Sequence, residues 1–155
     1  MALPQNHYTV MEKIALPNEI MLDEVVRLLD ENREVVIKPK GWSMLPFIRG
    51  EVDSVKLTKP NTLQVGDIVL ANIKGKYVLH RIYAINGENV TLMGDGNLQG
   101  VEHGTKTDVK GLVIEIITPA GKIRKPSKGI LWRKLLPIRK YLLKIYRKIN
   151  KYLYQ

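Results

Sequence analysis

The chain has 155 residues, enough for one domain with a buried core, and its 45% hydrophobic and 26% charged content is typical of a folded globular protein. It contains no cysteine, which excludes disulfides, thiolate catalysis and cysteine-based zinc sites. The net charge of +10 belongs to the C-terminal part: residues 122–151 carry twelve Lys and Arg and no Asp or Glu, whereas the preceding residues carry 13 basic and 15 acidic side chains. This near-neutral body argues against a broad nucleic-acid-binding face.

The N-terminal part predicts a polar leader, one helix and one strand. Residues 1–11 lack the positive segment and apolar core of a signal peptide, and residues 5–8 are predicted to be a flexible leader. A helix is expected to begin at Asn18 and to end within residues 30–33. Its apolar stripe consists of Ile20, Val25, Leu28 and Leu29. A short buried strand should follow at residues 35–37.

Residues 53–117 have the pattern of a β domain. The runs rich in Val, Ile, Leu and Tyr are residues 54–57, 68–73, 77–85, 90–93 and 112–117. Lys74-Gly75 and Asn86-Gly87 are expected to form two-residue hairpin loops, since glycine accepts positive φ there. Residues 94–107 are too rich in glycine and polar residues to predict a strand, and they form the longest expected loop of the body.

The basic tail predicts a linker at residues 126–129, a short helix at 130–136 and a second helix beginning at Pro137. Its apolar residues, spaced by three or four, are Ile138, Leu142, Ile145, Ile149 and Leu153. This pattern fits a helix lying on an anionic membrane surface, and it equally fits one that packs its apolar stripe on the sheet. An acidic partner is a further option, and nucleic acid is disfavoured. No segment approaches the roughly 20 apolar residues of a membrane span, so the expected location is the cytoplasm, with or without peripheral membrane contact.

Three residues are candidates for chemistry: Ser43, His80 and Asp95. Ser43 follows a glycine turn, where an irregular backbone can present a hydroxyl and free N–H groups, but serine is also an ordinary turn residue. His80 shares a strand face with apolar neighbours and could activate a serine, or it could be a satisfied core histidine. Asp95 lies between two glycines, where it could orient an imidazole or form an Asx turn. The other histidines, His7 and His103, are scattered, so neither a metal site nor a cofactor is expected.

The order of these segments resembles that of the signal peptidase I group, which is related in fold to the LexA-type self-cleaving repressors. The matching boxes are Gly41-Trp42-Ser43-Met44-Leu45-Pro46, Gly66-Asp67-Ile68-Val69, His80-Arg81, Gly94-Asp95-Gly96-Asn97 and Gly111-Leu112-Val113. The resemblance covers about residues 38–117. It implies a mainly β (α+β) fold with a coiled-sheet catalytic core. The core would comprise residues 38–121, the N-terminal part residues 1–37 and the basic helical tail residues 122–155.

The resemblance implies a serine endopeptidase that cleaves a peptide or precursor protein. Bacterial members generally use a Ser/Lys dyad, but His80 stands where the lysine would be, as in the archaeal and endoplasmic-reticulum branch. Ser43 would be the nucleophile, His80 its general base and the Ser43 N–H an oxyanion donor. Gly41 replaces the serine that adds a second donor in some members. Asp95 and Glu102 compete as the third catalytic member, with Asp95 preferred. The family's N-terminal membrane helix has no counterpart in the sequence, and a non-catalytic module for binding peptides or membranes on the same fold is the alternative.

Overall fold

The computed structural model describes residues 8–10 and 18–153. Its strands are β1 (Tyr8–Val10), β2 (Glu34–Ile37), β3 (Ser54–Thr58), β4 (Ile68–Ile73), β5 (Lys76–Asn86), β6 (Asn89–Met93), β7 (Glu102–Thr105), β8 (Val109–Ile117) and β9 (Ile123–Arg124). The helices are α1 (Asn18–Asp30), α2 (Ile130–Lys134) and α3 (Arg139–Leu153), with short 3₁₀ turns η1 (Lys106–Asp108) and η2 (Leu136–Ile138). The predicted mainly β class with helices at both ends is confirmed.

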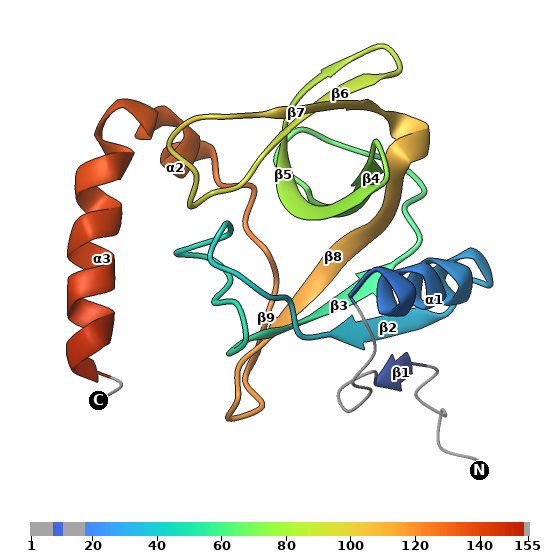
Figure 1. Ribbon diagram of the computed structural model, residues 1–155, viewed down its shortest axis with the longest axis horizontal. Helices are drawn as coiled ribbons and strands as arrows, with labels where there is room; N and C mark the ends of the chain where they lie inside the picture. The colour runs from blue at the N-terminus through green and yellow to red at the C-terminus, as the bar shows by residue number, and fades with distance from the viewer. Residues whose placement is uncertain (1–7, 11–17, 154–155) are drawn as a thin grey trace.

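The strands form one curled sheet in the order β1-β2-β3-β8-β4-β5-β6-β7, with β9 paired to β8 (Figure 1). Every pairing is antiparallel except that of β1 with β2. The long strand β8 joins the two halves, because it pairs with β3 along one part of its length and with β4 along another. Register shifts in both pairings mark where the sheet bends. The strands β4 to β7 thereby curl around one end of the molecule.

Two apolar clusters fill the two halves of this sheet. The first lies under α1, whose Val25, Leu28 and Leu29 pack against the strands β2, β3, β4 and β8. The second lies within the curl formed by β4, β5, β6 and β8. The predicted stripe of α1 is therefore correct at three of its four positions, but Ile20 is 56% exposed. Ile20 lies in the first turn of the helix, beyond the edge of the cluster that its later turns cover.

Both predicted hairpins are present. The β4–β5 loop is Lys74-Gly75, and both residues have positive φ (52° and 84°), as a type I′ turn requires. The β5–β6 loop is shifted by one residue from the expectation, because Asn86 pairs with Asn89 and leaves Gly87-Glu88 as the loop. Gly87 provides the positive φ at its first position, 57°.

Three elements differ from the sequence-based expectation. Residues 102–105 form the edge strand β7 on β6, although residues 94–107 were predicted to be a loop. Tyr8 belongs to β1 rather than to a flexible leader, and residues 5–7 of that leader lie outside the described residues. The short strand β9 was not predicted. All three are edge elements of two to four residues, whose pairing depends on a distant strand more than on their own composition.

The basic tail is joined to the sheet before its helices begin. Strand β9 pairs with the end of β8, and the chain then passes beside β5 to α2 and α3. Pro137 lies in η2, and α3 begins two residues later than predicted. Within residues 8–10 and 18–153, none of the helices is long and apolar enough to cross a membrane.

Candidate active site

Ser43 lies in the loop between β2 and β3, which is closed at its neck by backbone contacts. The N–H of Glu51 donates to the carbonyl of Pro39 over 2.7 Å. A Cβ on Gly50 would lie only 1.6 Å from the Gly41 carbonyl oxygen, so the neck accepts only glycine there. Next to the neck, the buried carboxylate of Asp53 accepts hydrogen bonds from the backbone and side chain of Arg49. We name residues 39–53 the nucleophile loop, after the role that the sequence predicts for Ser43.

The apolar side chains of the nucleophile loop fix its position on the core. Met44, Leu45 and Ile48 are 4%, 2% and 1% exposed, whereas Ser43 is half-buried and Trp42 is 56% exposed. Anchoring residues therefore follow Ser43 directly in the sequence. The Ser43 hydroxyl has no hydrogen-bond partner among the described residues, and its backbone N–H makes no hydrogen bond with any of them. A hydroxyl and an N–H are thus both available at this position.

The segment Gly94-Asp95-Gly96 lies directly against the backbone of the nucleophile loop. The N–H of Gly96 donates to the Ser43 carbonyl over 2.8 Å. A Cβ on Gly94 would lie 2.4 Å from that carbonyl oxygen, and a Cβ on Gly96 would lie 2.6 Å from the carbonyl oxygen of Trp42. Two glycines are needed here because the two backbones touch, and this contact sets the position of Ser43 relative to β5 and β6.

His80 lies on β5, close to the same glycine segment. Arg81 pairs with Met93 on β6, so His80 lies beside Gly94, one residue beyond the last pair of that ladder. Leu79 and Ser43 also line the same small hollow of about 20 Å³. The topology therefore brings the backbones around Ser43 and His80, which are 37 positions apart in the sequence, close to each other at Gly94, and no hydrogen bond joins the two side chains.

The imidazole of His80 is oriented by a carboxylate from β7. Its Nδ1 lies 2.8 Å from Oε2 of Glu102, which pairs in the sheet with Leu92. The His80 side chain is 7% exposed and that of Glu102 is 28% exposed, so this contact is largely shielded from water. The second ring nitrogen, Nε2, has no hydrogen-bond partner among the described residues and is not sealed from solvent. A carboxylate on Nδ1 keeps the proton there and leaves Nε2 as the acceptor.

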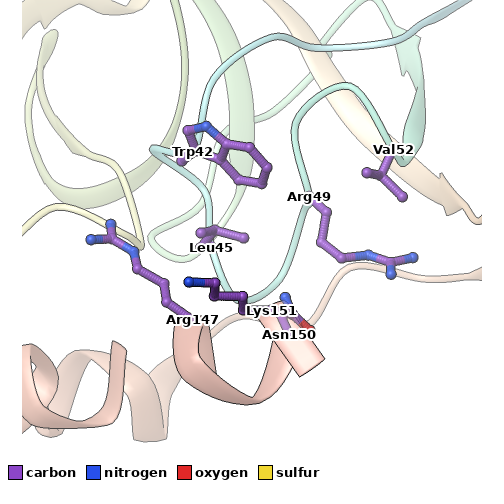
Figure 2. A pocket seen from close by; sticks show the side chains of 7 residues that line it. All are labelled: Trp42, Leu45, Arg49, Val52, Arg147, Asn150 and Lys151. Carbon is purple, nitrogen blue, oxygen red and sulfur yellow. The ribbon is translucent and has the colours of Figure 1, made fainter. Parts of the chain in front are cut away.

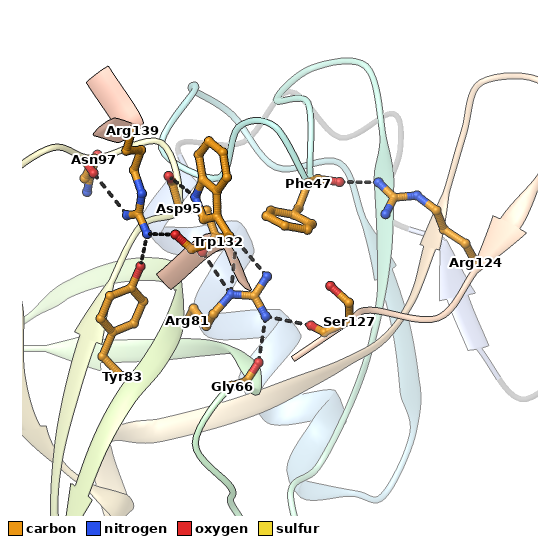
Figure 3. A network of polar contacts seen from close by, with 10 residues as sticks. All are labelled: Phe47, Gly66, Arg81, Tyr83, Asp95, Asn97, Arg124, Ser127, Trp132 and Arg139. Atoms are coloured by element: carbon orange, nitrogen blue, oxygen red, sulfur yellow. Dashed lines mark hydrogen bonds and ion pairs between the residues drawn. The ribbon is translucent and has the colours of Figure 1, made fainter. Parts of the chain in front are cut away.

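The carboxylate of Asp95 contacts Arg81 (Figure 3), whereas the acid that contacts His80 is Glu102, the other candidate for the third catalytic member. Both side chains of this ion pair are 0% exposed. Nε and Nη2 of Arg81 donate to the carboxylate of Asp95 over 2.7–3.1 Å. His80 and Arg81 are consecutive on a strand and point to opposite faces, which explains why a different acid contacts each of them. Of the two acids left open by the sequence, Glu102 is the one at His80.

The guanidinium of Arg81 also connects three distant segments of the chain. Its Nη1 donates to the carbonyls of Gly66 and Ser127 over 2.7 and 2.6 Å, and the guanidinium lies 5.0 Å from the centre of the Phe47 ring. Phe47 belongs to the nucleophile loop and stacks edge-on against Trp132 of α2, with 6.0 Å between ring centres. The Nε1 of Trp132 donates to the backbone carbonyl of Asp95 over 2.8 Å. The ion pair thus supports the glycine segment from the side opposite His80.

Two larger hollows flank the nucleophile loop. One, of about 530 Å³, lies between this loop and α3, with Trp42, Leu45 and Val52 on one wall and Arg147 and Lys151 on the other (Figure 2). The second, of about 300 Å³, is lined by Pro39, Lys40 and Leu79, which also line the small hollow that contains Ser43. The second hollow therefore borders the hollow at Ser43, and residues of β5, the strand that carries His80, line it.

No cluster of three or more histidine or acidic side chains with the geometry of a metal site occurs among residues 8–10 and 18–153. In comparisons with known proteins, no family model and no curated protein matches this chain.

Proposed function

We propose that the chain is a serine peptidase in which Ser43 is the nucleophile, His80 the general base and Glu102 the acid that orients His80. The observation that carries the proposal is the contact of 2.8 Å between Nδ1 of His80 and Glu102, on a strand whose neighbouring Gly94 touches the Ser43 backbone. A serine hydroxyl is a weak nucleophile unless a neighbouring base accepts its proton, and an oriented imidazole supplies that base.

In this mechanism, Oγ of Ser43 attacks the carbonyl carbon of a substrate peptide bond while Nε2 of His80 takes the hydroxyl proton. The negative charge that forms on the substrate oxygen is stabilised by the N–H of Ser43. Glu102 stabilises the imidazolium, which then protonates the leaving amine as the peptide bond breaks. Water activated by His80 next attacks the ester on Ser43, which releases the acid product and restores the hydroxyl.

The substrate we propose is a peptide or a precursor protein bound in an extended conformation. The hollow of about 300 Å³ beyond Leu79 is large enough for an apolar side chain, and Leu22, Leu70 and Leu79 are among its lining residues. A backbone laid along this hollow would pass the small hollow at Ser43. Recognition would then combine backbone contacts with one buried side chain, as is usual for peptide sites that use sheet edges.

The proposal is tested by incubating the purified protein with a synthetic peptide library and identifying new termini by mass spectrometry. Ser43→Ala and His80→Ala are expected to lower cleavage by at least about a thousandfold. The matched controls are Ser127→Ala and His103→Ala, which remove exposed side chains of the same kinds and should cleave as the wild type does. Each variant is checked for an unchanged thermal midpoint, so that loss of activity reports chemistry and not folding.

The role of Glu102 has its own test. Glu102→Gln removes the charge but preserves the shape, and we expect a fall in kcat of about a hundredfold to ten-thousandfold, as for other triad acids. Glu88→Gln, at an exposed position, is the control. Unchanged cleavage by Ser43→Ala would refute the peptidase. Peptide binding by a wild type that cuts no member of the library would instead support the non-catalytic binding module.

A further inference from the structure

Helix α3 carries a row of exposed apolar side chains along its length. Ile138, just before the helix, and Tyr141, Ile145 and Ile149 are 47%, 61%, 57% and 52% exposed. Their spacing of three or four residues places them on one side of the helix. A row of four large apolar side chains, each about half exposed, is more than the isolated exposed residues that protein surfaces in water tolerate.

The row is not the side by which α3 is attached to the body. The attachment is made by Arg139 and Leu143, which are 0% and 3% exposed. Arg139 donates to the hydroxyl of Tyr83 over 2.6 Å and to the carbonyls of Asn97 and Trp132. At 100° per residue, Arg139 lies about a third of a turn and Leu143 almost half a turn away from the centre of the apolar row. Helix α3 stands beside the body in Figure 1, and the exposure of the four side chains of the row shows that they lie outside this contact.

The rest of the helix surface is cationic. Its exposed basic residues are Lys140, Lys144, Arg147, Lys148 and Lys151. No acidic residue occurs anywhere after Glu115, so these charges have no acidic neighbour along the chain. The basic side chains of α3 therefore lie beside the apolar row, and no acidic residue of the same segment offsets their charge.

We propose that α3 binds in the interface of an anionic lipid bilayer, with the apolar row among the acyl chains and the lysines at the headgroups. An interfacial helix combines an apolar face with a strongly cationic polar face, and it is too polar as a whole to span the bilayer. Helix α3 has all three properties. A bilayer is favoured over a nucleic acid because phosphates would engage the lysines but leave the exposed Ile145 and Ile149 in water. This proposal does not depend on the peptidase activity, and Ser43→Ala should bind vesicles as well as the wild type does.

The test is flotation of the full chain with vesicles of phosphatidylcholine alone and of phosphatidylcholine with phosphatidylglycerol. We expect binding to the anionic vesicles only, weakened by salt because the charges are exposed. Ile145→Ser/Ile149→Ser should lower the vesicle partition coefficient by at least about a hundredfold, since two buried side chains are lost. Lys140→Gln/Lys144→Gln/Lys148→Gln should lower it by about fivefold for each charge removed.

Matched controls separate the helix from the general surface. Ile123→Ser removes an apolar side chain of β9 that is 57% exposed, and Lys74→Gln/Lys76→Gln removes two exposed charges of the β4–β5 hairpin. Both controls should bind as the wild type does. The proposal is overturned if the wild type does not float, or if Ile145→Ser/Ile149→Ser floats unchanged. It is also overturned if the wild type is a dimer that this double substitution converts to a monomer and neither form binds vesicles.

Discussion

Replacement of Asp95 by alanine is predicted to destabilise the fold severely. The substitution leaves the guanidinium of Arg81 buried without its counter-ion, because both side chains are completely shielded from water. It removes the acceptor of the three contacts of 2.7–3.1 Å that Arg81 makes with Asp95, while the bonds to Gly66 and Ser127 remain. Removing one partner of a buried ion pair typically costs about 3–5 kcal/mol. That is a large part of the roughly 5–15 kcal/mol by which a domain is stable.

The assay is urea unfolding followed by tryptophan fluorescence, since Trp132 hydrogen-bonds to the backbone of Asp95. With a denaturant slope of about 2 kcal/mol per molar urea, the midpoint should fall by about 2 M. Arg81→Met is expected to cost a similar amount by itself. The double variant Asp95→Ala/Arg81→Met should cost at least about 2 kcal/mol less than the sum, because no unpaired charge remains in it.

Two results would refute this reasoning. One is that Asp95→Ala lowers the free energy of unfolding by less than about 1 kcal/mol, the loss expected when an exposed ion pair is removed. The other concerns activity: Asp95→Asn, measured per folded molecule, should retain far more cleavage than Glu102→Gln. If Asp95→Asn instead lost cleavage as completely as Ser43→Ala while remaining stable, Asp95 would be the catalytic acid and the assignment of Glu102 would be wrong.

Two further predictions concern other contacts. Gly96→Ala should lower kcat by more than tenfold without removing any catalytic group, because its Cβ would lie 2.6 Å from the Trp42 carbonyl and displace the nucleophile loop. The control is Gly75→Ala, at a position that has positive φ but no close neighbour. Equal kcat values in the two variants would contradict the role given to the contact at Gly96. The pKa of Tyr77 is raised from 10.0 by burial and by the hydrogen bond of its hydroxyl to Asp23. The stability that this pKa shift contributes is complete below pH 10 and is lost as the pH rises through the higher pKa of the folded state. Thermal melts should show that loss in the wild type and not in Tyr77→Phe, which at neutral pH should be less stable by about 1 kcal/mol.

The sequence predicted most of the fold because its strong local signals coincide with the sheet. The Lys74-Gly75 hairpin and the strands around it follow from alternation and from positive φ at glycine, and both are properties of the local chain. Strand β7 could not be predicted in this way. Its sequence, Glu-His-Gly-Thr, has little strand propensity, and it is extended because β6 offers an unpaired edge.

For the candidate site, the sequence names Ser43 and His80, whose catalytic roles stay predictions. Ser43 and His80 stand out because each lies in a recognisable segment and the segments occur in a familiar order. The choice between Asp95 and Glu102 as the acid beside His80 could not be made from these segments, because it depends on which face of β5 each acid contacts. His80 and Arg81 are adjacent in sequence but face opposite sides, so Asp95 and Glu102 are assigned only when β6 and β7 are placed.

The bonds from Arg81 to Ser127 and from Trp132 to Asp95 have a practical consequence for dissecting this protein. The change in composition near Gly121 suggests a place to cut the chain and study the body without its tail. A truncation there would remove one acceptor from a fully buried arginine and would expose the ring of Phe47 that Trp132 covers. The shortened protein would therefore be a poor reference for the tail's contribution. Point substitutions on the outer side of α3 are the cleaner way to test the proposed membrane binding separately from the proposed peptidase activity.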